Sequence, residues 1–235
     1  MKKLGILGGM GPLATQLLYR MIIENTVASK DQEHIDMVIL SHATMPDRTK
    51  AILTGEKEEF VRAAAKDAKD LEMLGVSNIA IPCNTSHYFM DDIQAATNVP
   101  IINMVEESVR YAVEAYPEVK KIGIMGTDGT IQARTYHSAC ERAGIIPVVP
   151  TKERQKDVMS LIYDDIKGGK TGDKEKFTRA YEDLMEQGCD MIILACTELS
   201  VFRETAGLTD FYTDALEVLC EKAILNCGKE LREMV

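Results

Sequence analysis

Two segments of this 235-residue chain repeat each other, and each copy ends in a cysteine. The matched pairs, at one constant spacing, are Leu71 and Leu184, Gly75 and Gly188, Ile79 and Ile192, and Cys83 and Cys196. In both copies the pattern indicates the end of a helix, a glycine stop, a short apolar strand and then the cysteine. A second echo lies upstream, where residues 3–8 (KLGILG) are similar to residues 121–126 (KIGIMG). The chain is therefore predicted to consist of two related halves that each contribute one thiol.

Short apolar runs alternate with amphipathic stretches along the chain. The expected strands are 3–7, 36–40, 79–82, 101–103, 121–125, 146–149, 191–195 and 211–212. The expected helices include 12–25, 57–74, 105–115, 132–143, 157–167, 174–187 and a last one from Asp214 to about Leu231. Strands that alternate with helices form parallel sheets covered on both faces. We therefore predict an α/β fold with two lobes, each a four-stranded, mainly parallel sheet flanked by helices.

The repeat also divides the chain into two expected domains. No low-complexity linker separates the two halves. The first lobe is expected to comprise residues 1–103 plus 210–235, because the last helix can pack back onto it. The second lobe is expected to comprise residues 104–209.

The charge balance restricts the class of partner. A formal net charge of -10 argues against nucleic acid or an anionic membrane surface as a partner, although a few local cations can still hold a small anion. No stretch approaches the roughly 18 apolar residues of a membrane span, and glycines interrupt the start of the chain before a signal-peptide core can form. Six cysteines without a closely spaced framework are typical of the reducing cytoplasm. We expect a cytoplasmic protein that binds a small molecule.

Both repeated cysteines follow predicted strands, and in open parallel sheets ligands bind beyond these strand ends. Cys83 and Cys196 also precede helices, whose positive N-termini and free amides lower a thiol pKa and favour the thiolate. Asn84, Thr85 and Thr197 come next and could donate hydrogen bonds to a substrate carboxylate. A strand-end cysteine can also be a small buried hydrophobe, but two at matched positions of a repeat favour a functional pair. The remaining cysteines are interpreted as packing residues: Cys140, Cys189, Cys220 and Cys227.

A glycine-rich turn follows the first strand. Gly9, Gly11 and Ala14 match the G-x-G-x-x-A pattern of dinucleotide-binding proteins. The second strand, however, ends in Ser41 and His42 and provides no acidic residue for a ribose hydroxyl. A turn that lets the backbone approach a small ligand is therefore the better interpretation.

Two basic residues stand where an anionic substrate could bind. Arg48 follows the second strand and can bind a carboxylate through two parallel hydrogen bonds, although it could also be a solvated surface residue. Lys167 closes a predicted helix, where a lysine commonly complements the helix dipole. The four histidines lack the spacing of a metal site, and no HExxH or CxxC motif is present. His87, close behind Cys83, is expected to make a structural hydrogen bond, and the sequence implies no metal or other cofactor.

Four segments together resemble the aspartate/glutamate racemase family, and its aspartate racemase branch most. They are residues 8–11 (GGMG), 46–49 (PDRT), 82–85 (PCNT) and 195–199 (ACTEL). The resemblance spans essentially the whole chain and implies two pseudo-symmetric α/β lobes, an active site in the cleft between them, no cofactor and a homodimer. By the same resemblance, Cys83 and Cys196 stand at the positions of the two catalytic bases. Substrate contacts are implied at Met10, Arg48, Asn84, Thr85, Thr127 and Lys167.

The chain departs from glutamate racemases at two positions. Gly9 and Met10 stand where that branch has Asp-Ser, and Glu198 stands where it has a histidine. The resemblance therefore implies a small dicarboxylic amino acid as substrate, with aspartate ahead of glutamate. One cysteine, as thiolate, would remove the Cα proton, and the other, as thiol, would donate a proton to the opposite face.

Two other functions remain open from the sequence. Related two-cysteine enzymes carry out maleate-type cis–trans isomerisation or malonate decarboxylation, although such a decarboxylase would need only one of the two thiols. The chain could instead bind a dicarboxylate without turnover, against which the presence of both thiols argues.

Overall fold

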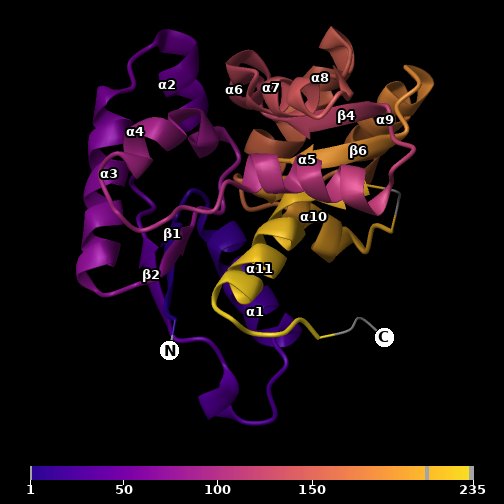
Figure 1. The fold of residues 1–235 in the computed structure, drawn as a ribbon. Coiled ribbons are helices and arrows are strands. Elements are labelled where there is room, and N and C mark those ends of the chain that lie inside the picture. Colours follow the sequence, from indigo (N-terminus) through magenta and orange to yellow (C-terminus); the bar gives the residue numbers. More distant parts are fainter. Residues whose placement is uncertain (1, 210–211, 233–235) are drawn as a thin grey trace.

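The computed structural model describes residues 2–209 and 212–232, and it contains two parallel sheets flanked by helices, as predicted (Figure 1). The first sheet has the order β2-β1-β3 and is formed by β1 (Leu4–Gly8), β2 (Met37–Ser41) and β3 (Asn78–Ala80). The second has the order β5-β4-β6-β7 and is formed by β4 (Lys121–Gly126), β5 (Ile146–Val148), β6 (Met191–Ala195) and β7 (Tyr212–Asp214). The first strand of each sheet, β1 or β4, is an inner strand with a neighbour on either side. One of these neighbours, β3 or β6, is followed by a cysteine of the repeat, Cys83 or Cys196.

Helices cover both faces of each sheet. The first lobe contains α1 (Pro12–Asn25), η1 (Asp31–Glu33), α2 (Arg48–Thr54), α3 (Glu58–Met73), η2 (Thr85–Phe89) and α4 (Met90–Gln94). The remainder of the chain contributes α5 (Met104–Ala115), α6 (Asp128–Ala133), α7 (Thr135–Arg142), α8 (Lys152–Ser160), the π-helix η3 (Leu161–Ile166), α9 (Lys174–Glu186), α10 (Thr197–Ala206) and α11 (Ala215–Asn226). No helix in this described part of the chain is both long and apolar enough to cross a membrane.

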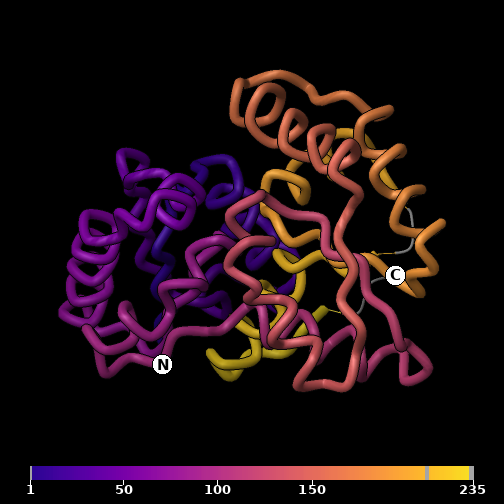
Figure 2. The backbone as a smooth tube through the Cα atoms, turned by 90° about the horizontal axis from the view of Figure 1, so that it is seen from above, coloured from indigo at the N-terminus to yellow at the C-terminus, as the bar shows by residue number. Residues whose placement is uncertain are grey.

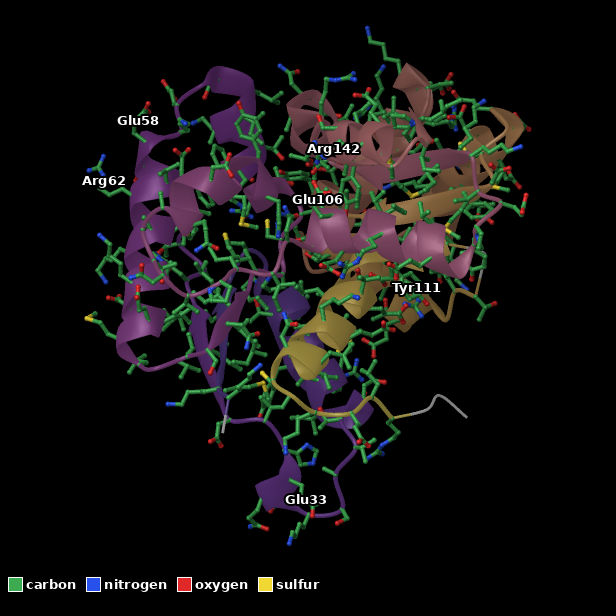
Figure 3. The ribbon with its side chains drawn as sticks, viewed as in Figure 1. Glu33, Glu58, Arg62, Glu106, Tyr111 and Arg142 are labelled. Atoms are coloured by element: carbon green, nitrogen blue, oxygen red, sulfur yellow. The ribbon has the colours of Figure 1, made fainter. Side chains whose placement is uncertain are left out.

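The helix α3 shows how the sequence pattern produces a packed layer. Its apolar residues at helical spacing, among them Phe60 and Leu71, are fully buried against the first sheet. Glu58 and Arg62 of the same helix point outward (Figure 3). Gly75 follows the helix with a positive φ of 72°, which glycine adopts without steric cost and which allows the chain to turn into β3.

The fourth strand predicted for the first sheet is reduced to one bridge. Ile101 pairs with Ile79 in parallel, but the ladder does not extend further. Pro100 has no N–H to donate, and the side chain of Asn103 accepts a hydrogen bond from the Glu106 amide and thereby starts α5. The first sheet is therefore three-stranded, whereas the second has the predicted four strands.

The C-terminal segment joins the two lobes more closely than the predicted division at residue 210 implies. β7 pairs with β6 in the second sheet, where Tyr212 lies opposite Ile192, and Phe211 of the predicted strand lies outside the described residues. α11 packs against α1 and α5, and seen from above it runs between the lobes (Figure 2). One hydrophobic core consequently includes Ile6 of the first sheet, Ile193 of the second and Leu219 of α11. Two further cores fill the outer faces of the sheets.

Candidate active site

All residues that the sequence predicted for a site surround one small cavity between the lobes. The cavity is lined by Met10, Asp47, Arg48, Thr49, Cys83, Asn84, Thr85, Thr127, Tyr163, Lys167, Cys196, Thr197 and Glu198. Its volume is about 10 Å³, which is close to the minimum for one water molecule. The structure therefore brings both thiols and both cations together in a closed arrangement.

Cys83 lies in the loop between β3 and η2, and two neighbours fix its surroundings. His87 donates a hydrogen bond from Nδ1 to the carbonyl oxygen of Cys83 over 2.9 Å, while its Nε2 accepts one from the Met104 amide over 3.2 Å. This confirms the structural role that the sequence predicted for His87. Arg48 lies beside Cys83: burial lowers the pKa of its guanidinium, but Cys83, together with nearby carboxylates, outweighs burial and raises it overall.

Cys196 is the N-cap residue of α10, and its thiol is held by a carboxylate two residues further on. The Sγ atom donates to Oε2 of Glu198 over 3.0 Å. Burial and then the negative charge of Glu198 raise the pKa of Cys196 well above its ordinary value, although Lys167 acts in the opposite direction. The backbone at the start of α10 does lower the pKa of this thiol, but burial and the adjacent carboxylate outweigh it, so the expectation of a lowered pKa at Cys196 is wrong.

Lys167 follows η3 and reaches the cavity from the second lobe. Its Nζ lies 3.5 Å from Oε1 of Glu198 and 4.8 Å from the centre of the Tyr163 ring. Burial lowers the pKa of Lys167, but Glu198, Cys196 and Tyr163 raise it overall. Tyr163 in turn donates a hydrogen bond over 3.1 Å to Oδ2 of Asp47 in the first lobe. The charged side of the cavity is thus held by contacts that cross between the lobes.

Asn84 is oriented by a tyrosine of the opposite lobe. The hydroxyl of Tyr136, which is fully buried in α7, donates to Oδ1 of Asn84 over 2.5 Å. The amide oxygen is thereby occupied, and the Nδ2 group of Asn84 is left without a partner. Asn84 consequently presents a hydrogen-bond donor to the cavity.

The threonines predicted as substrate contacts make hydrogen bonds across the lobe boundary. The Thr85 hydroxyl lies 3.1 Å from that of Thr127 and 2.9 Å from that of Thr130. Thr197 donates to the carbonyl oxygen of Pro82 over 3.3 Å. In the closed arrangement these hydroxyls therefore bind protein atoms.

The glycine-rich turn after β1 packs against protein backbone. Gly9 has a φ of 90°, and a Cβ atom there would lie 2.4 Å from the backbone of His42. The prediction that this turn lets the backbone approach a small ligand is wrong at Gly9, because the backbone next to Gly9 is that of His42, the residue that follows β2. Met10 nevertheless reaches the site, because its carbonyl oxygen accepts a hydrogen bond from Nη2 of Arg48 over 3.2 Å.

Three buried polar atoms around the cavity have no hydrogen-bond partner. They are Nε of Arg48, Nδ2 of Asn84 and Oε1 of Glu198, of which the last faces Lys167 at ion-pair distance only. Burying an unpaired polar group typically costs about 1–3 kcal/mol. Two donors and one acceptor left in this state match a ligand that carries carboxylate oxygens and an ammonium group.

Sequence reasoning missed Asp47, Tyr136, Tyr163 and Glu198 as site residues. Glu198 carried a local signal, since a carboxylate in the first turn of a helix, two residues after a candidate thiol, is placed to reach it. The two tyrosines carried none, because each belongs to a different lobe from the side chain that it contacts.

The other thiols are buried and lie away from this cavity. Burial raises the pKa of Cys140 and Cys220 to about 12, and that of Cys189 to about 11.

A larger hollow of about 520 Å³ lies between α1, α5, α10 and α11, but neither Cys83 nor Cys196 lines it. Among residues 2–209 and 212–232, no cluster of three or more His, Cys, Asp or Glu side chains is arranged to hold a metal ion.

His87 makes the stability of this region depend on pH. Burial lowers its pKa below 6.5, so the folded protein keeps the ring neutral where the unfolded chain takes up a proton. His87 therefore contributes stability above about pH 6.5 that is lost as the pH falls toward the lower pKa of the folded state. Thermal unfolding across pH 5–7.5 should show a fall in Tm toward acid that is smaller in His87→Gln. Equal slopes for the two proteins would contradict this assignment.

Comparisons with known proteins agree with the fold. The family model described as Asp/Glu/Hydantoin racemase matches residues 7–217. The chain is 31% identical over 201 residues to the broad specificity amino-acid racemase RacX of Bacillus subtilis, covering 84% of this chain and 86% of that protein.

Two solved structures share the architecture. An aspartate racemase from Picrophilus torridus superposes with a TM-score of 0.82 at 26% identity, covering 99% of this chain and 96% of the other. An aspartate racemase homologue from Pyrococcus horikoshii superposes with a TM-score of 0.76 at 26% identity, covering 97% and 100%. With a matching family model over most of its length, this chain belongs to the Asp/Glu/hydantoin racemase family.

Proposed function

We propose that this protein is a cofactor-independent amino-acid racemase that interconverts L- and D-aspartate by proton transfer between Cys83, Cα and Cys196. The observation that carries the proposal is the convergence of two thiols with the three unpartnered buried atoms in one cavity. The names of the similar proteins, an aspartate racemase and a broad specificity amino-acid racemase, support the same reaction class.

The unpartnered atoms suggest how an amino acid is held. Nε of Arg48 and Nδ2 of Asn84 can donate to carboxylate oxygens, and Oε1 of Glu198 can accept from the α-ammonium group. Lys167 adds a second cation, which suits a substrate with two carboxylates. Maleate-type isomerisation is less well supported, because its substrate has no ammonium group to pair with the Glu198 oxygen.

The chemistry needs one thiolate and one thiol on opposite sides of Cα. The thiolate takes the Cα proton, so that an S–H bond forms as the C–H bond breaks. The thiol of the second cysteine then gives its proton to the opposite face of the carbanion and becomes the thiolate. Arg48, Asn84 and Lys167 stabilise the charge that develops on the substrate carboxylates during this exchange.

Substrate entry requires the cavity to enlarge. A dicarboxylic amino acid is several times larger than the single water molecule that the closed cavity can hold. The hydrogen bonds that close it, from Tyr163 to Asp47 and from Thr197 to Pro82, link the two lobes. Binding is therefore expected to proceed through separation of the lobes at this side, followed by closure that excludes water.

The decisive experiment is proton NMR in D2O of both enantiomers of aspartate, glutamate and alanine with the purified protein and no added cofactor. Loss of the Cα proton signal of aspartate, with appearance of the other enantiomer by chiral chromatography, would support the proposal. Turnover of alanine as fast as aspartate would instead assign the broad specificity named for the Bacillus relative. Absence of exchange with every substrate would overturn racemase function in favour of binding without turnover.

Tyr136 provides a test of the role assigned to Asn84. In Tyr136→Phe the Oδ1 atom of Asn84 loses its donor, so the amide can rotate and present oxygen to the substrate carboxylate. We expect kcat/KM for aspartate to fall about tenfold, the equivalent of one lost hydrogen bond of about 1.4 kcal/mol. Tyr111→Phe, on α5 and outside the cavity, is the matched control and should leave kcat/KM unchanged. An unaltered kcat/KM in Tyr136→Phe would remove Tyr136 from the mechanism.

A further inference from the structure

The two thiols of the cavity lie in opposite electrostatic surroundings, although they occupy matched positions of the repeat. Arg48, a cation, lines the same cavity as Cys83 and interacts with it electrostatically. Glu198, an anion, accepts a hydrogen bond from the Cys196 thiol over 3.0 Å. A pair that is symmetric in sequence is therefore asymmetric in charge.

Resting on the two-cysteine reaction proposed above, we infer that the Glu198 carboxylate keeps Cys196 in its protonated thiol form in the free enzyme, so that Cys83 acts as the base and Cys196 as the acid when a turnover begins. Glu198 acts through Cys196 and is in this respect a positioning residue.

The geometry of Glu198 supports this role. Its side chain is 8% exposed and lies in the first turn of α10, two residues after the N-cap cysteine. Oε2 is used by the thiol, whereas Oε1 faces Lys167 over 3.5 Å and Gly11, where an added Cβ atom would lie 3.1 Å away. The carboxylate is thus confined between the turn after β1 and the thiol, and the absence of a side chain at Gly11 leaves it room.

Other charged and titratable groups act on the same thiol, and their effects differ in sign. The helix N-terminus and Lys167 favour the thiolate, whereas burial and Glu198 oppose it. The titratable groups that face Cys196 and Glu198 from the neighbouring elements are Arg48 and Asp47 of the α2 start, Cys83 of the β3–η2 loop, Tyr163 and Lys167 of the η3 segment, and Tyr136 of α7. With Glu198 as the nearest of the anions, the net effect favours the protonated thiol.

The reaction cycle gives this asymmetry a consequence. A turnover that starts from the Cys83 thiolate ends with a proton on Cys83 and a thiolate on Cys196, next to the Glu198 carboxylate. Two like charges at this distance repel each other. The enzyme that has just released product therefore has a driving force to return a proton to Cys196. This happens either by uptake of a proton from solvent, while Cys83 loses its proton to solvent, or by turning over the opposite enantiomer.

The test measures thiolate formation directly, in the full-length protein without substrate. Iodoacetamide is added at pH values from 6 to 10, and residue-specific alkylation is followed by mass spectrometry of tryptic peptides. Cys189 lies in the same tryptic peptide as Cys196 and serves as an internal reference. Its own pKa of about 11 keeps it largely protonated over most of this range.

In the wild-type protein we expect Cys83 to be alkylated faster than Cys196 at neutral pH. In Glu198→Gln the Cys196 midpoint should fall by at least about one pH unit, the usual size of a near charge effect, which makes its alkylation about tenfold faster at neutral pH. Glu198→Asp retains the charge and should keep Cys196 slow. Glu204→Gln, on the same helix but outside the cavity, is the matched control and should change neither thiol.

Three results would overturn the inference. The first is a Cys196 rate in Glu198→Gln within twofold of wild type at every pH. The second is a wild-type Cys196 that reacts faster than Cys83 at neutral pH, and the third is a Glu198→Asp variant that behaves like Glu198→Gln. Because alkylation needs no substrate, the outcome is independent of whether the protein racemises aspartate, and circular dichroism of each variant identifies one that has failed to fold.

Discussion

Cys83→Ser and Cys196→Ser should each lose racemisation of aspartate by at least about a hundredfold and up to about ten-thousandfold, the range that general acid–base catalysis contributes. Serine keeps the size of the side chain, but its hydroxyl is too weak a base to accept the Cα proton near neutral pH. The loss should appear in kcat, because a thiol that transfers the proton acts in the transition state.

The two serine variants should differ from each other in D2O. The remaining thiolate can still remove a proton from its own face of Cα and return a deuteron, so each variant is expected to exchange only one enantiomer or to lose exchange altogether. Proton NMR with separate enantiomers measures this preference, which should be opposite in the two variants. Cys189→Ala is the matched control, since Cys189 precedes β6 as Cys196 follows it, and should lose activity only through any packing cost. Near wild-type racemisation by either serine variant would rule out the paired-thiol mechanism.

The sequence predicted the positions of the two thiols well, for a reason that lies in the topology. The carboxyl ends of parallel strands meet at one edge of a sheet, so a cysteine after β3 and another after β6 are carried to the same side of two facing sheets. Arg48 was found for the same reason, because it follows the second strand, whereas Lys167 was assigned to the site only by the resemblance to the racemase family. The positions of residues at this edge follow from the order of strands and helices along the chain, and the hydrophobic periodicity of the sequence predicts that order.

The electrostatic asymmetry of the site could not be predicted in the same way. Whether Cys196 feels the helix end or Glu198 more strongly depends on burial and on one side-chain contact of 3.0 Å. The orientation of Asn84 depends on Tyr136, which comes from another lobe and has no local pattern that points to Asn84. The missing fourth strand of the first sheet is a milder case, because Pro100 was visible in the sequence and its lack of an N–H already limits pairing.

Arg48→Ala should reduce kcat/KM for aspartate roughly ten- to a hundredfold, because a hydrogen bond to a charged group is worth about 1.5–3 kcal/mol. Arg48 is 7% exposed, and its guanidinium is fixed by hydrogen bonds from Nη1 to the Pro46 carbonyl oxygen over 3.0 Å and from Nη2 to that of Met10. Those two contacts fix the guanidinium and leave Nε unpartnered, so Arg48→Lys, which cannot make both of them and also present a donor, should not restore activity. Lys50→Ala, on the exposed side of the same helix, is the matched control and should retain wild-type kcat/KM.

Steady-state kinetics with aspartate and alanine, together with Tm, separate a binding role from a folding one. A role in dicarboxylate recognition predicts a larger loss for aspartate than for alanine at similar Tm, whereas an unchanged kcat/KM for aspartate would exclude Arg48 from the site.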